Sequence, residues 1–190
     1  RPCERACTAE AIDRSVAHNP EGAIVEVEVG SIVVATGYQV MDKGWFKEMA
    51  PASANVITAL QLERIISATG PTEGKLLRPS DHEKPHTLTF VSCMGSRDEH
   101  FHTYCSRFCC MYMIKQARLL KEKYPDLTIN MHFIDVRAAG KGYDEYYTGA
   151  RAMGINFFKG KVGGLEMLPN DRLRVLAYDM EAATSIEYAS

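Results

Sequence analysis

The sequence predicts an α/β fold, because strand-like and helix-like patterns alternate through its second half. Short apolar runs rich in β-branched residues are separated by longer segments with apolar residues at helical spacing. In chain order these are a strand at Thr87–Ser92, a helix at Cys109–Lys123, a strand at Thr128–Asp135, a helix at Asp144–Met153 and a strand at Ile155–Lys159. Strands that alternate with helices form parallel sheets. The βαβαβ succession predicts one half of a Rossmann-like domain.

Composition and charge indicate an ordinary globular protein and exclude several kinds of partner. Apolar residues make up 46% of the 190 residues, which is enough for a packed core. A net charge of −2 provides no basic surface for nucleic acid, and no apolar run approaches the roughly 20 residues of a membrane span. We therefore expect no nucleic-acid binding and no direct membrane insertion. Six cysteines in a chain of this length do not suggest a disulfide scaffold, which favours a reducing, cytoplasmic setting.

The two ends of the sequence predict a fragment of a longer protein. It opens on Arg1-Pro2 without Met, and it stops at Ala189-Ser190 directly after a predicted strand. From Gly160 onward the pattern predicts hairpin strands that carry little visible chemistry.

Cys3 and Cys7 form a C-x3-C pair near the start of the chain, followed by Ala and Ile. This is how the second half of a ferredoxin motif ends, although Thr8 stands where that motif has proline. With upstream residues present, Cys3 would ligate one cluster and Cys7 the neighbouring one. Two ordinary cysteines remain the alternative.

Two strands are expected next, at Ala23–Val29 and Ser31–Thr36. The first alternates apolar and charged residues, and the second is a continuous β-branched run like that of a strand buried on both faces. The second run ends in Ala35, Thr36 and Gly37, small residues that let a ligand approach the backbone at the carboxyl end of a strand. A plain core strand is the alternative.

A helix is expected to begin after Thr58 and to end before Gly70, with a packing role only. Residues 38–57 before it are expected to form a loop. Residues 71–86 after it are rich in Pro and charge, so we expect a connector and a domain boundary there.

Four of the six cysteines lie in one loop, at Cys93, Cys105, Cys109 and Cys110, with the spacing C-x11-C-x3-C-C. Thiolates ligate iron–sulfur clusters, and a [4Fe–4S] centre takes four. Three of these cysteines with His100 or His102 would instead suit zinc. A redox disulfide or buried free thiols are further alternatives.

This loop occupies the position where a dinucleotide-binding G-x-G-x-x-G would open the helix, and only Gly95 is present. We therefore expect no NAD(P) here, and electrons that arrive through metal rather than as hydride. The N-terminus of the following helix would favour an anionic cluster, and Arg97 and Arg107 would add positive charge. Asp135 and Arg137 follow the second strand and are expected to line a pocket or an interface.

The chain resembles the family of the heterodisulfide reductase A-subunit. The resemblance is carried by the following segments: IVVATGY, NVITALQLERIISATGPTEG, RPSD, CMGSRDE with YCSRFCCMYMIK, and DVRAAGKGYDEYY. It covers about residues 24–165.

The resemblance implies a thioredoxin-reductase-like FAD fold in which the cysteine loop carries a [4Fe–4S] cluster on Cys93, Cys105, Cys109 and Cys110. Lys115 matches the lysine close to the flavin and is the candidate catalytic residue, while Ala35, Thr36 and Gly37 match the strand end beside FAD. The implied division is an inserted ferredoxin-like segment at 1–22, part of the FAD domain with a connector at 23–84, the Rossmann-like half at 85–165 and trailing strands at 166–190.

The resemblance also implies an oxidoreductase component that passes electrons between iron–sulfur clusters and FAD, with electron bifurcation between ferredoxin and a disulfide. Its implied partners are other heterodisulfide reductase subunits, an iron–sulfur subunit of a hydrogenase or dehydrogenase, and ferredoxin. A related subunit of membrane-associated complexes in sulfate reducers is an alternative. A zinc-stabilised interaction module and a thiol–disulfide enzyme that attacks through Cys109 or Cys110 are the rivals from other classes.

Overall fold

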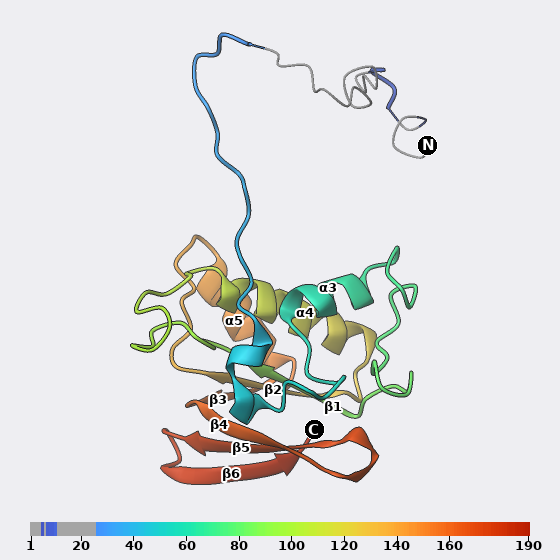
Figure 1. The fold of residues 1–190 in the computed structure, drawn as a ribbon, viewed down its shortest axis with the longest axis vertical. Coiled ribbons are helices and arrows are strands. Elements are labelled where there is room, and N and C mark those ends of the chain that lie inside the picture. The colour runs from blue at the N-terminus through green and yellow to red at the C-terminus, as the bar shows by residue number, and fades with distance from the viewer. Residues whose placement is uncertain (1–4, 6, 11–25) are drawn as a thin grey trace. The chain divides into compact units, whose positions relative to one another are not determined.

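The computed structural model describes residues 5, 7–10 and 26–190, arranged in two units, 1–39 and 40–190. Figure 1 shows the chain and its elements. Among the described helices, none has the length and apolar content needed to cross a lipid bilayer.

The described part of the first unit contains no β-strand, so the strand expected at Ser31–Thr36 is not present in this structure. The same holds for residues 26–29 of the strand expected at Ala23–Val29, and residues 23–25 lie outside the described part. The physical reason is the lack of a partner, since a strand exists only where another strand accepts its backbone hydrogen bonds. Ile32, Val33 and Val34 are 80%, 87% and 77% exposed.

The second unit has three layers, with helices on one face of a parallel sheet and an antiparallel sheet on the other (Figure 1). The helices are α3 (Ala59–Ile66), α4 (Cys109–Lys123) and α5 (Tyr143–Ala152), and the short 3-10 turns are η1 (Lys43–Trp45), η2 (Lys47–Met49) and η3 (Pro169–Asp171). The parallel strands are β1 (Thr87–Val91), β2 (Thr128–Phe133) and β3 (Asn156–Lys159), in the spatial order β1-β2-β3. The antiparallel strands are β4 (Val162–Met167), β5 (Leu173–Asp179) and β6 (Thr184–Ala189).

The predicted succession of strands and helices is therefore confirmed from β1 to β3, and so are the hairpin strands after Gly160. The α4 helix has the predicted bounds, while β2 ends two residues before the predicted Asp135. The helix expected after Thr58 is also present. A capping box fixes its start, because Thr58 Oγ1 accepts from Gln61 N–H at 3.3 Å and Gln61 Oε1 accepts from Thr58 N–H at 2.8 Å.

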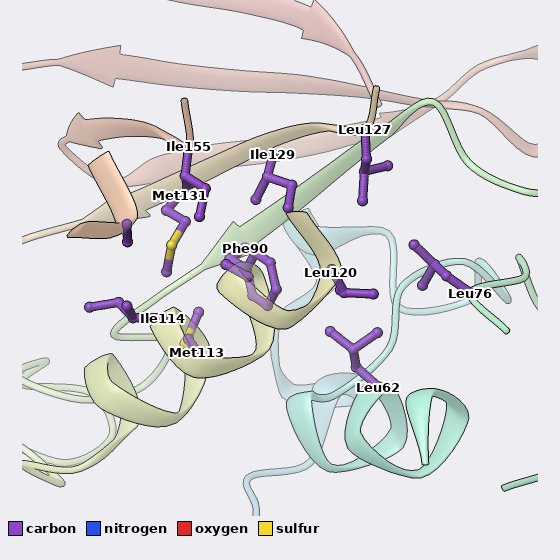
Figure 2. Packing of buried hydrophobic residues seen from close by; sticks show 12 residues of the cluster. Leu62, Leu76, Phe90, Met113, Ile114, Leu120, Leu127, Ile129, Met131 and Ile155 are labelled. Carbon is purple, nitrogen blue, oxygen red and sulfur yellow. The ribbon is translucent and has the colours of Figure 1, made fainter. Parts of the chain in front are cut away.

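The main core lies between the helices and the parallel sheet. Side chains of β2 such as Ile129 and Met131 point toward α4, whose Ile114 and Leu120 meet them (Figure 2). Leu62 of α3 closes the same cluster, and this contact explains why α3 lies against α4. Burial of one such side chain contributes about 2 kcal/mol.

The other face of the parallel sheet packs on the antiparallel sheet through a smaller apolar cluster that includes Val162, Val175 and Ala177. A buried polar contact crosses this interface. His132 of β2 is 1% exposed, its ring is stacked on Phe158 and Tyr188, and its Nε2 lies 2.7 Å from the Tyr188 hydroxyl. Tyr188 also lies 3.2 Å from Thr89 Oγ1.

His132 should make the fold sensitive to acid. Burial lowers the pKa of His132 to about 4, and the nearby Asp179 acts in the opposite direction. The unfolded chain takes up this proton below about pH 6.5 and the folded chain resists it, so stability is lost as pH falls from about 6.5 toward 4. Between pH 7 and pH 5 the loss should be about 2 kcal/mol more for the natural chain than for His132→Phe, measured by urea unfolding. Equal pH slopes for the two proteins would contradict this account.

Candidate functional site

The cysteine loop (residues 92–108) connects β1 to α4 and emerges at the carboxyl edge of the parallel sheet. The loop folds back on itself through backbone hydrogen bonds. His102 N–H donates to Gly95 O at 3.1 Å, Asp98 N–H to His102 O at 3.0 Å, and Arg97 N–H to Tyr104 O at 3.1 Å. These bonds give a long loop a defined shape.

Left-handed backbone conformations allow these turns. Cys93, Arg97 and Arg107 have φ values of 61°, 58° and 66°, a region that costs a non-glycine residue about 1 kcal/mol or more. Such conformations persist only where the surroundings hold them. The backbone bonds and the ion pair of Arg97 with Asp135 supply that support.

Three of the four sulfurs accept a hydrogen bond. Arg107 N–H donates to Cys105 Sγ at 3.3 Å, and Ser106 Oγ donates to Cys109 Sγ at 3.3 Å. Beyond the loop, Arg137 N–H donates to Cys110 Sγ at 3.5 Å. The backbone of Ile134 acts to lower the pKa of Cys93, against the larger effect of burial. Donors directed at sulfur stabilise a thiolate over a thiol.

The thiols are close enough to affect one another. Burial raises the pKa of Cys93, and the proximity of Cys109 and Cys105 raises it further. The pKa of Cys109 is lowered to about 6, first because the Cys110 thiol donates a hydrogen bond to it, and the pKa of Cys110 is raised by the same contact. Cys109 and Cys110 form the first turn of α4, where the helix dipole also favours negative charge. All four are free thiols.

The donor set suits a group that takes four thiolates, because the cysteine loop supplies two sulfurs and the first turn of α4 that follows it supplies the other two. Within residues 5, 7–10 and 26–190, however, the side chains do not form a closed metal-binding group of three or more ligands. His100 and His102, the histidines that a zinc site would use, are both exposed. The ring of His102 packs against Tyr104, with 5.0 Å between the ring centroids. The histidines therefore give the zinc alternative no geometric support.

Lys115 lies on α4, five residues beyond Cys110, or about 7.5 Å along the helix axis. Its Nζ forms an ion pair with Glu63 Oε1 of α3 at 2.7 Å. The buried Gln116 donates to the other Glu63 oxygen at 2.8 Å, and the pKa of Glu63 is lowered by its hydrogen bonds to Lys115 and Gln116. An ammonium has three N–H donors, so Lys115 retains donors beyond the one directed at Glu63.

Glu63, the ion-pair partner of Lys115, was not predicted from the sequence. It lies 52 positions from Lys115 on a helix for which only a packing role was expected. Its partner is set by the contact between α3 and α4, and no local pattern reports that contact.

Asp135 and Arg137 lie at the end of β2 and contact the cysteine loop. Asp135 Oδ1 accepts from Arg97 Nη1, and its Oδ2 pairs with Arg137 Nε at 2.9 Å. The sequence placed all three residues near the predicted site but did not pair them.

The remaining predicted site residues belong to the first unit. Ala35, Thr36 and Gly37 are exposed, and Gly37 has a φ of 78°. Cys7 is partly buried and its carbonyl accepts from Glu10 N–H at 3.2 Å. Cys3 lies outside the described residues.

Comparison with known proteins identifies relatives. A protein of Archaeoglobus profundus, named as similar to the heterodisulfide reductase A-subunit, is 56% identical over 98% of this chain and 29% of its own length. The A-subunit of the H(2):CoB-CoM heterodisulfide,ferredoxin reductase of Methanothermobacter marburgensis is 42% identical, over 98% of this chain and 28% of its own. The A-subunit of the Ferredoxin/F(420)H(2)-dependent CoB-CoM heterodisulfide reductase of Methanosarcina acetivorans is 46% identical, over 84% and 20%.

No protein-family model matches the sequence. The chain spans less than a third of the length of these relatives, and the matches cover most of the chain. The names of the relatives are those of an oxidoreductase component. By its sequence, the chain belongs to the family of the heterodisulfide reductase A-subunit, of which it represents one part.

Proposed function

We propose that this chain is the part of a heterodisulfide reductase A-subunit that passes electrons between a [4Fe–4S] cluster and FAD. The observation that carries the proposal is the set of four thiols in and directly after the cysteine loop. Three of them accept hydrogen bonds, and the fourth, Cys93, is close enough to the others for their charges to affect its pKa or theirs. Identity of 42% and 56% to proteins named for this reductase supports it.

The proposed architecture is a thioredoxin-reductase-like FAD fold of which β1–α4–β2–α5–β3 is a Rossmann-like half. The parallel order β1-β2-β3 supports this, because such a half places consecutive strands side by side. Residues 1–22 would be the end of an inserted ferredoxin segment, in which Cys3 and Cys7 ligate separate clusters.

Cys93, Cys105, Cys109 and Cys110 would be the cluster ligands. When bound, such a cluster supplies one-electron transfer. The protein's own contribution is charge stabilisation. N–H groups of Arg107 and Arg137 and the hydroxyl of Ser106 are directed at the sulfurs, and they favour the thiolate form that binds metal.

Lys115 would contact the flavin, while an FAD-binding role for Ala35, Thr36 and Gly37 rests on the family resemblance alone. The ion pair with Glu63 supports a fixed position for the ammonium, which is half exposed and carries spare donors. A cation placed against a flavin stabilises negative charge on the reduced ring and holds a proton-donating group near it.

The proposed partners follow from the relatives' names, which mention H(2), ferredoxin and the CoB-CoM heterodisulfide. The complete protein would work with other heterodisulfide reductase subunits, an iron–sulfur subunit of a hydrogenase or dehydrogenase, and ferredoxin. In electron bifurcation, electrons from a donor such as H(2) would be divided between ferredoxin and the disulfide, with FAD held by the complete protein.

The lowered pKa of Cys109 at the start of α4 favours one second candidate, a thiol–disulfide enzyme. In that case the purified protein would be colourless and metal-free, and Cys109 would react rapidly with an alkylating reagent. In a protein that carries the cluster, Cys109 should be protected from alkylation.

The chain purified without oxygen should contain about four irons and four sulfides at the cysteine loop. Cys109→Ser should lose most of this iron, because a hydroxyl is a poor substitute for a thiolate ligand. Cys7→Ser is the matched control and should keep it, since Cys7 lies in a different unit. Iron and sulfide assays and the visible spectrum before and after dithionite provide the measurement.

Zinc bound to the same cysteines, with no visible absorption, would contradict the proposed electron transfer. Equal iron in the Cys109→Ser and natural proteins would remove Cys109 from the ligand set.

Lys115 and Glu63 should shift the FAD reduction potential in opposite directions in the complete protein. Lys115→Met removes the cation and should lower the potential, whereas Glu63→Gln removes its counter-charge and should raise it. Shifts of tens of millivolts are expected, since about 30 mV corresponds to about 1.4 kcal/mol in a two-electron couple. Glu122→Gln, near the far end of α4, is the control and should leave the potential unchanged. A redox titration of the flavin absorbance decides the outcome.

A further inference from the structure

The stretch from Ile134 to Arg137 lies close to two of the cysteines. Arg137 N–H donates to Cys110 Sγ at 3.5 Å, and the Asp135 carbonyl oxygen is 3.9 Å from the same sulfur. The backbone of Ile134 acts to lower the pKa of Cys93, against the larger effect of burial. We refer to residues 134–137 as the backbone platform of these two sulfurs.

The side chain of Asp135 attaches this platform to the cysteine loop. One carboxylate oxygen accepts from Arg97 of the loop, and the other pairs with Arg137 Nε at 2.9 Å. Both oxygens are thus engaged, each by a different guanidinium, which fixes the orientation of the carboxylate. We refer to Arg97, Asp135 and Arg137 as the Arg–Asp–Arg triad.

The triad also supports the left-handed backbone conformation of the cysteine loop. Arg97 has a φ of 58° and lies four positions after Cys93, whose φ is 61°. Left-handed conformations of this kind need outside support. The ion pair of Arg97 with Asp135, across 38 positions of sequence, is a long-range contact that supplies it.

We propose that Asp135 is a positioning residue, which through Arg97 holds the backbone platform, with the N–H donor of Arg137, against the cysteines and thereby sets the reduction potential and the lability of the cluster. The inference rests on the proposed function, because it assumes that these cysteines ligate a cluster. Hydrogen bonds to ligating sulfur raise the potential of iron–sulfur clusters, and partners of the ligands commonly govern metal retention.

A purely electrostatic role and a positioning role of Asp135 predict different shifts of the cluster potential when either member of the Arg97–Asp135 ion pair is changed. If the triad acted only through its charges, Arg97→Gln would lower the potential and Asp135→Asn would raise it. If Asp135 acts by holding the platform, both variants release the same N–H donor and both lower the potential. The positional effect acts in contact with sulfur, whereas the Asp135 carboxylate is 41% exposed and is screened by water.

The test compares Asp135→Asn, Arg97→Gln and Arg97→Lys in the complete protein, with Asp126→Asn as a matched control. Asp126 forms an ion pair with Lys84 at 2.7 Å, so the control also changes an acid to an amide in an ion pair. The potential is measured by redox titration with electron paramagnetic resonance, and lability by the rate of iron release to a chelator.

We expect a negative shift of the cluster potential in both Asp135→Asn and Arg97→Gln, and iron release at least about threefold faster than in the natural protein, in line with the effect of outer contacts on metal affinity. Arg97→Lys keeps the charge and should show an intermediate effect. If Asp135→Asn retains no iron although its circular dichroism is unchanged, faster release from Arg97→Lys supports the same role for the pair.

Shifts of opposite sign in Asp135→Asn and Arg97→Gln would overturn the positional role. The positional role would also be overturned if Asp135→Asn and Asp126→Asn had the same cluster potential and the same rate of iron release. Either result would leave the proposed function intact, because the natural protein would still contain the cluster. Absence of iron from the natural protein would instead contradict the proposed function itself.

Discussion

The structure depends on the central position of β2, which pairs with β1 on one side and β3 on the other. Ile129 and Met131 pack on the helices, while Asn130 and His132 face the antiparallel sheet. Since side chains alternate along a strand, a slip of one residue would place the polar set in the apolar core. This register also determines where residues 134–137 emerge, and hence which backbone N–H groups meet the cysteines.

The site combines elements that are far apart in the sequence but converge at one edge of the sheet. The thiols come from the loop after β1 and the start of α4, and one of their donors, Arg137 N–H, comes from the segment that follows β2. In parallel sheets the carboxyl ends of neighbouring strands lie together, which is why ligand sites commonly form there. The family relationship and the geometry thus both indicate a site at the carboxyl edge of the parallel sheet.

The sequence was most informative where structure is local. The α4 helix was predicted with its observed bounds because its apolar spacing and adjacent cysteines are contained within the segment itself. The run at Ser31–Thr36 was predicted as a strand, but strand formation depends on a partner, and within the described residues it has none. Contacts such as Lys115 with Glu63 and Arg97 with Asp135 were not predicted, since they depend on how helices and strands pack across 52 and 38 positions.

The α4 helix carries Cys109 and Cys110 in its first turn and Lys115 about a turn and a half later. A rigid helix fixes the spacing between these residues, whereas the loop before it can change in length without disturbing them. One residue inserted between Cys110 and Lys115 would rotate the lysine by about 100° around the helix axis and away from Glu63. Across this family, the interval from Cys109 to Lys115 should therefore tolerate neither insertion nor deletion.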